Sequence, residues 1–100
     1  MKRFDEIIGE SRPTLVDFYA TWCGPCRRQM PILEDVKDKM RDKINLLKID
    51  IEQNQELTDR YRIQSVPTIM IFKNGEIMWR ASGIQSLADI MMALNKAEWR

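Results

Sequence analysis

Short apolar runs alternate along the chain with stretches in which apolar residues recur at helical spacing. The near-continuous apolar run at residues 14–20 predicts a strand covered on both faces, and residues 44–51 predict a second strand. Residues 68–73 and 76–81 flank the pair Asn74-Gly75, which predicts an antiparallel hairpin with a tight turn. The chain is therefore expected to contain about four main strands.

Four stretches with apolar residues at i, i+3 and i+4 predict helices. They cover residues 2–10, 24–42 and 54–61, and the last helix begins at Ser86. Asn54 and Ser86 are suited to cap their helices through the side chain. Because a long helix connects the first two strands, these strands are expected to be parallel.

This order of elements predicts a single α/β domain over residues 1–100, without repeats, linkers or low-complexity segments. No strand is predicted before the first helix, so the strand at residues 44–51 is expected at an edge of the sheet. The seven methionines are expected to fill the core. Trp79 is expected to pack in the core, and Trp99 is expected to pack in the tail of the chain.

Composition and charge argue against several classes of function. The formal net charge of +1, with mixed signs, argues against nucleic acid or an anionic membrane as the main partner. No apolar stretch approaches the roughly 20 residues of a membrane helix. The first residues contain no apolar signal core, so a cytoplasmic protein is expected. Histidine is absent, which excludes Ser-His and Cys-His nucleophile pairs and histidine metal ligands.

Cys23 and Cys26, the two cysteines of the chain, lie at the junction of a predicted strand and a predicted helix. This spacing on the first helical turn is typical of a redox dithiol. At the helix N-terminus, unpaired N–H groups and the helix dipole stabilise a thiolate, so Cys23 is predicted to be the nucleophile. Cys26, deeper in the helix, is predicted to be the resolving thiol. The alternatives are two buried small hydrophobic residues or half of a metal site shared between chains.

Several motifs together resemble the thioredoxin family. The first is Trp22-Cys23-Gly24-Pro25-Cys26, which follows Val16-Asp17-Phe18-Tyr19-Ala20. Ser65-Val66-Pro67-Thr68 is similar to the family's cis-proline loop, and Phe72-Lys73-Asn74-Gly75-Glu76 is similar to its last hairpin. Gly83 stands where the family has a glycine that faces the active site. The resemblance implies a thioredoxin fold, a three-layer α/β/α arrangement with a mixed sheet, whose first strand is here short or missing.

Two charged residues are expected near the cysteines. Asp17 stands in the middle of a covered strand, where the loss of water disfavours the ionised form. It either pairs with a neighbouring group or, as the resemblance implies, accepts the proton of Cys26. Lys48, on the neighbouring strand, is either a solvated edge residue or, as the resemblance implies, a cation that keeps the buried carboxylate ionisable.

The resemblance also implies a docking surface for substrates. The Val66–Pro67 peptide bond is expected to be cis and to face the disulfide, although Pro67 also fits a plain strand entry. Ser65 and Ser82 differ from the residues that are common in the family, and this difference bears on the choice of partner. A flat, mostly apolar patch is expected around an exposed Cys23, from Trp22, Gly24, Pro25, Val66, Gly83 and Ile84.

These features predict a protein-disulfide reductase that acts through Cys23–Cys26 without a bound cofactor or metal. The resemblance implies a monomer with disulfide-containing protein substrates, recharged by an NADPH-dependent thioredoxin reductase. One alternative is a thiol oxidase or isomerase of an oxidising compartment. The other is a thioredoxin-like binding subunit, whose role would survive the loss of Cys23.

Overall fold

The computed structural model describes residues 2–98, which form a four-stranded sheet with the strand order β2-β1-β3-β4. Its strands are Thr14–Tyr19 (β1), Asn45–Asp50 (β2), Thr68–Lys73 (β3) and Glu76–Ser82 (β4). β1 is parallel to β2, whereas β3 is antiparallel to both β1 and β4. The predicted mixed sheet is confirmed, and so is the edge position of the second strand.

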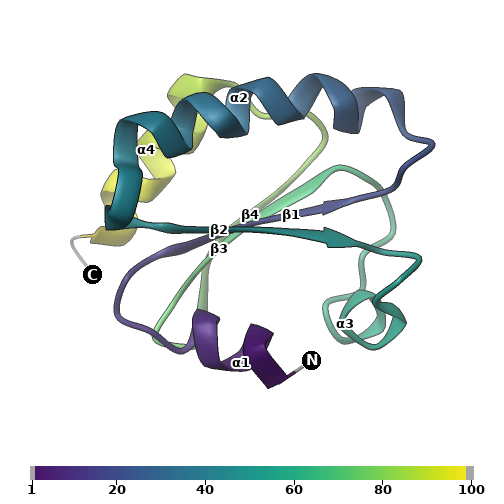
Figure 1. Cartoon of the computed structure of the whole chain (residues 1–100), viewed down its shortest axis with the longest axis horizontal. Helices are drawn as coiled ribbons and strands as arrows, with labels where there is room; N and C mark the ends of the chain where they lie inside the picture. Colours follow the sequence, from purple (N-terminus) through teal and green to yellow (C-terminus); the bar gives the residue numbers. More distant parts are fainter. Residues whose placement is uncertain (1, 99–100) are drawn as a thin grey trace.

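Helices cover both faces of this sheet (Figure 1). One face carries α2 (Gly24–Met40), which a short 3₁₀ turn extends, and α4 (Leu87–Glu98). The other face carries α1 (Lys2–Ile8) and α3 (Gln55–Arg60). The layers are those of the predicted α/β/α arrangement. No helix within residues 2–98 is long and apolar enough to cross a membrane.

Alternating side chains of β1 contribute to two separate hydrophobic cores. Leu15 faces α2 and α4 together with Ile69, whereas Val16 and Phe18 face α1 and α3. All four side chains are fully buried, because β1 and β3, which carries Ile69, lie in the interior of the sheet and between two helical layers. This double coverage explains the near-continuous apolar run of the sequence, and it makes Asp17 the charged exception within β1.

The hairpin between β3 and β4 has the predicted two-residue turn. Asn74 and Gly75 have φ values of 54° and 79°, as a type I′ turn requires. Their backbone N–H groups donate to the carbonyl oxygens of Glu10 and Ile8, each at 2.8 Å. These bonds tie the hairpin to the end of α1.

The two predicted helix caps have different outcomes. Ser86 caps α4, since its Oγ accepts a hydrogen bond from the N–H of Asp89 at 3.1 Å. Asn54 occupies the N-cap position of α3, but its side chain does not cap the helix. Its amide donates instead to the carbonyl oxygen of Asp50 at 3.0 Å, so it closes the turn that follows β2.

The prediction that methionines fill the core is confirmed for Met70 and in part for three others, which are partly buried and pack against it: Met40, Met78 and Met91. It is wrong for the remaining two that the structure describes. Met70, in the central strand β3, is fully buried, whereas Met30 and Met92 are exposed. Met30 lies beside, and not on, the buried stripe of α2, so helical geometry turns it toward solvent. Trp79 is partly buried against the core beneath α2 and α4, as predicted. The prediction for Trp99 lies outside the described residues.

Candidate active site

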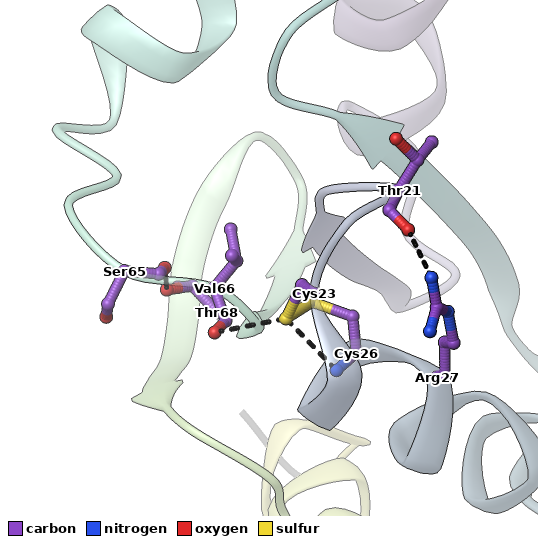
Figure 2. The surroundings of a disulfide bond; sticks show 7 residues. All are labelled: Thr21, Cys23, Cys26, Arg27, Ser65, Val66 and Thr68. Atoms are coloured by element: carbon purple, nitrogen blue, oxygen red, sulfur yellow. Dashed lines mark hydrogen bonds between the residues drawn. A yellow bond between two sulfur atoms is a disulfide. The ribbon is translucent and has the colours of Figure 1, made fainter.

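A disulfide joins Cys23 and Cys26 at the start of α2, just after β1 (Figure 2). Cys23 is the N-cap residue, and its Sγ accepts a hydrogen bond from the backbone N–H of Cys26 at 3.2 Å. The missing N–H of Pro25 costs nothing in the first helical turn. The Arg27 guanidinium donates to the carbonyl oxygen of Thr21 at 3.1 Å, which closes the turn before Cys23. The Cys23 sulfur therefore lies where a helix N-terminus favours a thiolate.

Both cysteines are nearly inaccessible to solvent in the oxidised protein. The exposed fraction is 4% for Cys23 and 2% for Cys26, so the prediction of an exposed Cys23 is wrong for this state. They cluster with Ala20, and the partly buried Tyr19 and Val66 pack against this cluster. Cys23 therefore offers a substrate little accessible surface in this state. The surrounding surface therefore decides which disulfides can approach.

The loop before β3 faces the disulfide, as predicted (Figure 2). The Val66–Pro67 peptide bond is cis, and the carbonyl oxygen of Val66 lies 3.6 Å from the Sγ of Cys23. The backbone N–H of Gly83, just after β4, donates to the carbonyl oxygen of Pro67 at 2.8 Å. Two segments far apart in sequence from Cys23 are thus brought together beside it.

Two residues of the predicted docking surface are large, apolar and exposed. Trp22 is 64% exposed and Ile84 is 40% exposed, unusual values for large hydrophobic residues. The Trp22 indole N–H donates to Oε2 of Glu52 at 3.2 Å, which restrains the ring. Gly83 has a φ of 84°, a conformation that suits glycine and lets the backbone turn next to Ile84. The flanks of the disulfide can therefore contact an apolar partner.

Asp17 is a buried carboxylate without a hydrogen-bond partner. Its exposed fraction is 1%, and neither carboxylate oxygen is paired within residues 2–98. It lies on β1 between Leu15, which belongs to the core beneath α2, and Tyr19, which packs against the disulfide cluster. Burial raises the pKa of Asp17 from 3.8 to about 6, and the charge of Lys48 opposes this change. A carboxyl group with this pKa is suited to accept a proton near neutral pH.

Lys48 is close to Asp17 across the sheet, although its side chain is exposed on the edge strand β2. The two residues are register partners in the parallel pairing of β1 with β2, so both side chains lie on the same face. Lys48 acts through its electric field, because the oxygens of Asp17 accept no hydrogen bond from it. Lys48 is thus an exposed edge residue whose charge favours the ionised form of Asp17, and its role in the reaction stays a prediction.

Gln29 is a buried polar residue close to the disulfide that sequence reasoning missed. The buried positions of α2 are Cys26, Gln29, Leu33 and Val36, so an amide stands on an otherwise apolar stripe next to the disulfide. Its side chain makes two hydrogen bonds to the backbone of Gln85. The available signal was a polar residue at helical spacing between Cys26 and Leu33.

Comparison with known proteins places the chain in a family. A family model described as thioredoxin matches residues 1–96. The chain belongs to the thioredoxin family. It is 37% identical over 93 residues to the thioredoxin of Rickettsia typhi, an alignment that covers 93% of this chain and 89% of that protein.

Two other thioredoxins give similar results. The chain is 44% identical over 95 residues to rice "Thioredoxin Y, chloroplastic", covering 94% of this chain and 56% of the rice protein. It therefore spans just over half the length of that relative. The solved structure of a Malassezia sympodialis thioredoxin has a TM-score of 0.87 and 28% identity, covering 97% of this chain and 84% of that one.

Thioredoxins are thiol–disulfide oxidoreductases, and the dithiol pair for this chemistry is present at Cys23 and Cys26. The redox interpretation of the two cysteines is thereby favoured over a shared metal site. Within residues 2–98, no three metal-ligating side chains of the Cys, Asp or Glu type gather closely enough to hold an ion. Thiol–disulfide exchange needs only the sulfurs and a means of moving protons.

Proposed function

We propose that this thioredoxin reduces disulfide bonds in other proteins. The observation that carries the proposal is the position of Cys23, whose sulfur lies at the N-terminus of α2 and accepts the N–H of Cys26 at 3.2 Å. This placement stabilises a thiolate at the atom that substrates can reach. The residues between the cysteines, Gly24 and Pro25, and the absence of histidine resemble the reducing members of the family.

The exchange proceeds in two balanced steps. The Cys23 thiolate attacks one sulfur of the substrate disulfide, whose S–S bond breaks, and a mixed disulfide and one substrate thiolate result. Cys26 then gives its proton to Asp17 and attacks the Cys23 sulfur. The mixed disulfide breaks, the second substrate thiolate leaves, and the Cys23–Cys26 disulfide forms. Two electrons pass from the dithiol to the substrate.

The surface around the disulfide supports an extended protein segment as the substrate. The loop at Val66–Pro67 presents backbone beside the Cys23 sulfur, and the exposed side chains of Trp22 and Ile84 provide apolar contacts. Backbone pairing with apolar anchors is a general mode of peptide recognition. It admits many sequences, which suits an enzyme that acts on several proteins.

A separate NADPH-dependent reductase is proposed to restore the dithiol, in a reducing compartment such as the cytoplasm. Support comes from the family and from the chemistry, because the oxidised pair must receive two electrons after each turnover. A thiol oxidase or isomerase would share the site but would work in the opposite direction. A binding subunit would need the surface and not the thiols.

The reduction potential of the Cys23–Cys26 pair, measured by equilibration with glutathione, tests this proposal. A reductase should have a potential clearly below that of the glutathione couple, because its disulfide must be harder to reduce than those of its substrates. A potential well above that of glutathione would identify an oxidase or isomerase. Cys23→Ser should abolish the activity, and an unaffected biological role would support the binding subunit.

A further inference from the structure

Gln29 connects α2 to the segment that follows β4. Its side chain is fully buried, one turn after Cys26. Nε2 donates to the carbonyl oxygen of Gln85 at 3.0 Å, and Oε1 accepts from the N–H of Gln85 at 2.7 Å. The amide thus pairs with both polar groups of one backbone residue, as a neighbouring strand would. Both halves of a buried amide are satisfied by this single partner.

Residues 83–85 follow the end of β4 at Ser82 and lie outside any helix or strand, so their backbone needs other hydrogen-bond partners. The Gln85 side chain supplies some of them, because its Nε2 donates to the carbonyl oxygens of Ser82 and Gly83, each at 3.1 Å. The segment is thus a closed turn organised around Gln85. Only the backbone of Gln85 ties this turn to Gln29 in α2.

The same turn is bonded to the loop that faces the disulfide. The N–H of Gly83 donates to the carbonyl oxygen of Pro67 at 2.8 Å, and the preceding carbonyl, that of Val66, lies 3.6 Å from the Cys23 sulfur. A continuous series of contacts therefore leaves α2 at Gln29, passes through both segments that flank the disulfide, and returns to Cys23 at the start of the same helix.

We propose that Gln29 is a positioning residue for thiol–disulfide exchange. It holds the turn at residues 82–85, and through this turn the loop at Val66–Pro67, in place beside Cys23. A purely structural role is less well matched to the contacts. α2 and α4 already pack through an apolar core that includes Leu33 and Leu94, and an apolar residue at position 29 would extend it. The amide instead provides hydrogen-bond partners for the backbone of the turn at Gln85.

This inference rests on the proposed reduction of protein disulfides, and it predicts a preference among substrates. An extended peptide that lies along the Val66–Pro67 loop gains from a preformed surface, because less conformational freedom is lost on binding. A small disulfide without flanking peptide uses little of this surface. Loss of Gln29 should therefore weaken the reaction with peptides much more than the reaction with small disulfides.

Gln29→Met tests the prediction, because methionine is similar in length and lacks the amide. The KM for a short disulfide-bonded peptide should rise about tenfold with a change in kcat of at most about twofold, since ground-state binding is lost. The factor by which kcat/KM falls should be at least about threefold smaller for a small aromatic disulfide than for the peptide. Equal losses with both substrates, or no change in the KM for the peptide, would overturn the proposal.

Lys37→Met is the matched control. Lys37 lies toward the far end of the same helix, and its Nζ donates to the backbone carbonyl oxygens of Arg41 at 2.6 Å and Ile44 at 2.9 Å. The variant also removes two bonds from α2 to the backbone, but it leaves the segments beside the disulfide intact. Its ratio of peptide to small-disulfide activity should equal that of the wild type. A matching rise in KM would show that lost stability alone explains both variants.

Hydrogen exchange tests the positioning independently of activity. In the oxidised wild type, the amides of Gly83 and Gln85 should be protected, and in Gln29→Met both should exchange at least about tenfold faster while the core of α2 is unaffected. Faster exchange at Gln85 alone would refute the connection to the Val66–Pro67 loop. Unprotected amides in the wild type would refute it without any variant. If the wild type does not reduce the peptide, the proposed function fails, and hydrogen exchange still decides the role of Gln29.

Discussion

Asp17 illustrates a conflict between stability and chemistry at a single residue. With a pKa of about 6, its carboxyl group is mostly ionised at neutral pH, although no hydrogen bond within residues 2–98 compensates the buried charge. Lys48 offsets only part of the cost of burial. Folding alone would favour an apolar residue at this position in β1. We propose that the carboxyl group serves instead to accept the proton that Cys26 must lose.

The first prediction concerns the stability of Asp17→Asn. Because the pKa in the folded protein lies above 3.8, the folded state binds more protons between these values, and its stability falls as pH rises through about 6. The free energy of unfolding of the variant, relative to that of the wild type, should increase by roughly 3 kcal/mol between about pH 3 and about pH 8. Denaturant unfolding of both oxidised proteins measures it. A difference in unfolding free energy that does not change with pH would contradict the raised pKa of Asp17.

A second prediction concerns the kinetics of the same variant. If Asp17 accepts the proton of Cys26, release of the mixed disulfide should speed up in the wild type as pH rises through about 6, because the carboxylate must be ionised. Asp17→Asn should slow this step roughly 100-fold and remove that inflection. Single-turnover measurements across pH provide the test. Unchanged turnover at neutral pH over a range of substrate concentrations would exclude the role.

A third prediction separates the roles of the two thiols. In Cys26→Ser, Cys23 can still attack a substrate, but no resolving thiol releases it. A covalent complex with a disulfide-containing protein should therefore accumulate, and a non-reducing gel should show it. Cys23→Ser provides the comparison, since it should form none. Accumulation with Cys23→Ser instead would reverse the two assignments.

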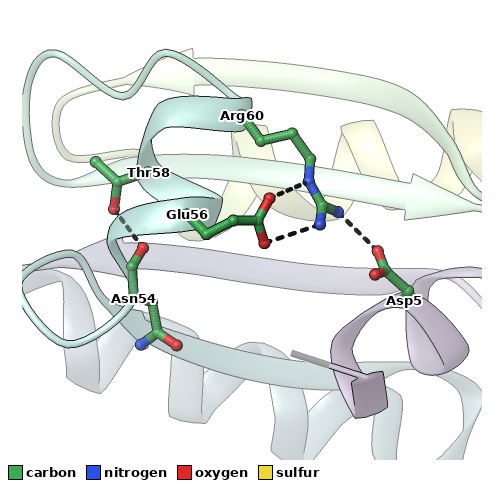
Figure 3. A network of polar contacts seen from close by, with 5 residues as sticks. All are labelled: Asp5, Asn54, Glu56, Thr58 and Arg60. Atoms are coloured by element: carbon green, nitrogen blue, oxygen red, sulfur yellow. Dashed lines mark hydrogen bonds and ion pairs between the residues drawn. The ribbon is translucent and has the colours of Figure 1, made fainter.

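Among the elements, α1 shows which contacts attach a short helix to the sheet. The ring of Phe4 is fully buried and contacts those of Tyr61 and Phe72, with centroids 6.1 Å and 5.9 Å away. Arg60 of α3 also pairs with Asp5 at 2.7 Å and with Glu56 at 3.0 Å (Figure 3). These charged groups are partly exposed, so solvent screens their attraction. Aromatic burial should dominate the attachment of α1.

Two substitutions test this ranking. Phe4→Ala should lower the free energy of unfolding by about 3–5 kcal/mol, because it removes a large buried ring and leaves a cavity. Arg60→Gln should lower it by at most about 1 kcal/mol, with little effect remaining at high salt. Denaturant unfolding compares the two variants. A larger effect of Arg60→Gln would mean that the ion pairs, and not the rings, hold α1.

At the scale of the whole molecule, one edge of the sheet is the parallel strand β2, which pairs with β1 on one side and with no strand of residues 2–98 on the other. β2 carries the exposed cation Lys48 in its middle and polar residues at both ends, Asn45 and Asp50. Charges on an edge strand oppose pairing with a second copy. We therefore expect a monomer.

Analytical ultracentrifugation over a range of protein concentrations tests this expectation. The wild type should sediment as one monomeric species, and Lys48→Val should increase self-association because it removes the charge from the edge. Lys43→Val, an exposed position in the turn before β2, provides a control that should remain monomeric. A wild-type dimer would show that the edge pairs despite Lys48.

Local sequence by itself determined most of the fold and the centre of the site. The apolar run of β1, the helical stripe behind Cys26 and the Asn74-Gly75 turn each act on near neighbours along the chain, so residue patterns reveal them. Cys23 and Cys26 pair within one helical turn, which makes their disulfide a local feature too. The order and spacing of these residues were therefore enough to predict the elements and the redox pair.

Only the tertiary structure decided how the site is surrounded. Gln29 meets Gln85, and Cys23 meets Val66, across long separations in sequence that no local pattern encodes. The burial of Cys23 and the unpaired oxygens of Asp17 likewise depend on every element packed around them. Solvent access and hydrogen-bond partners are properties of packing in three dimensions, and therefore periodicity and composition could not specify them.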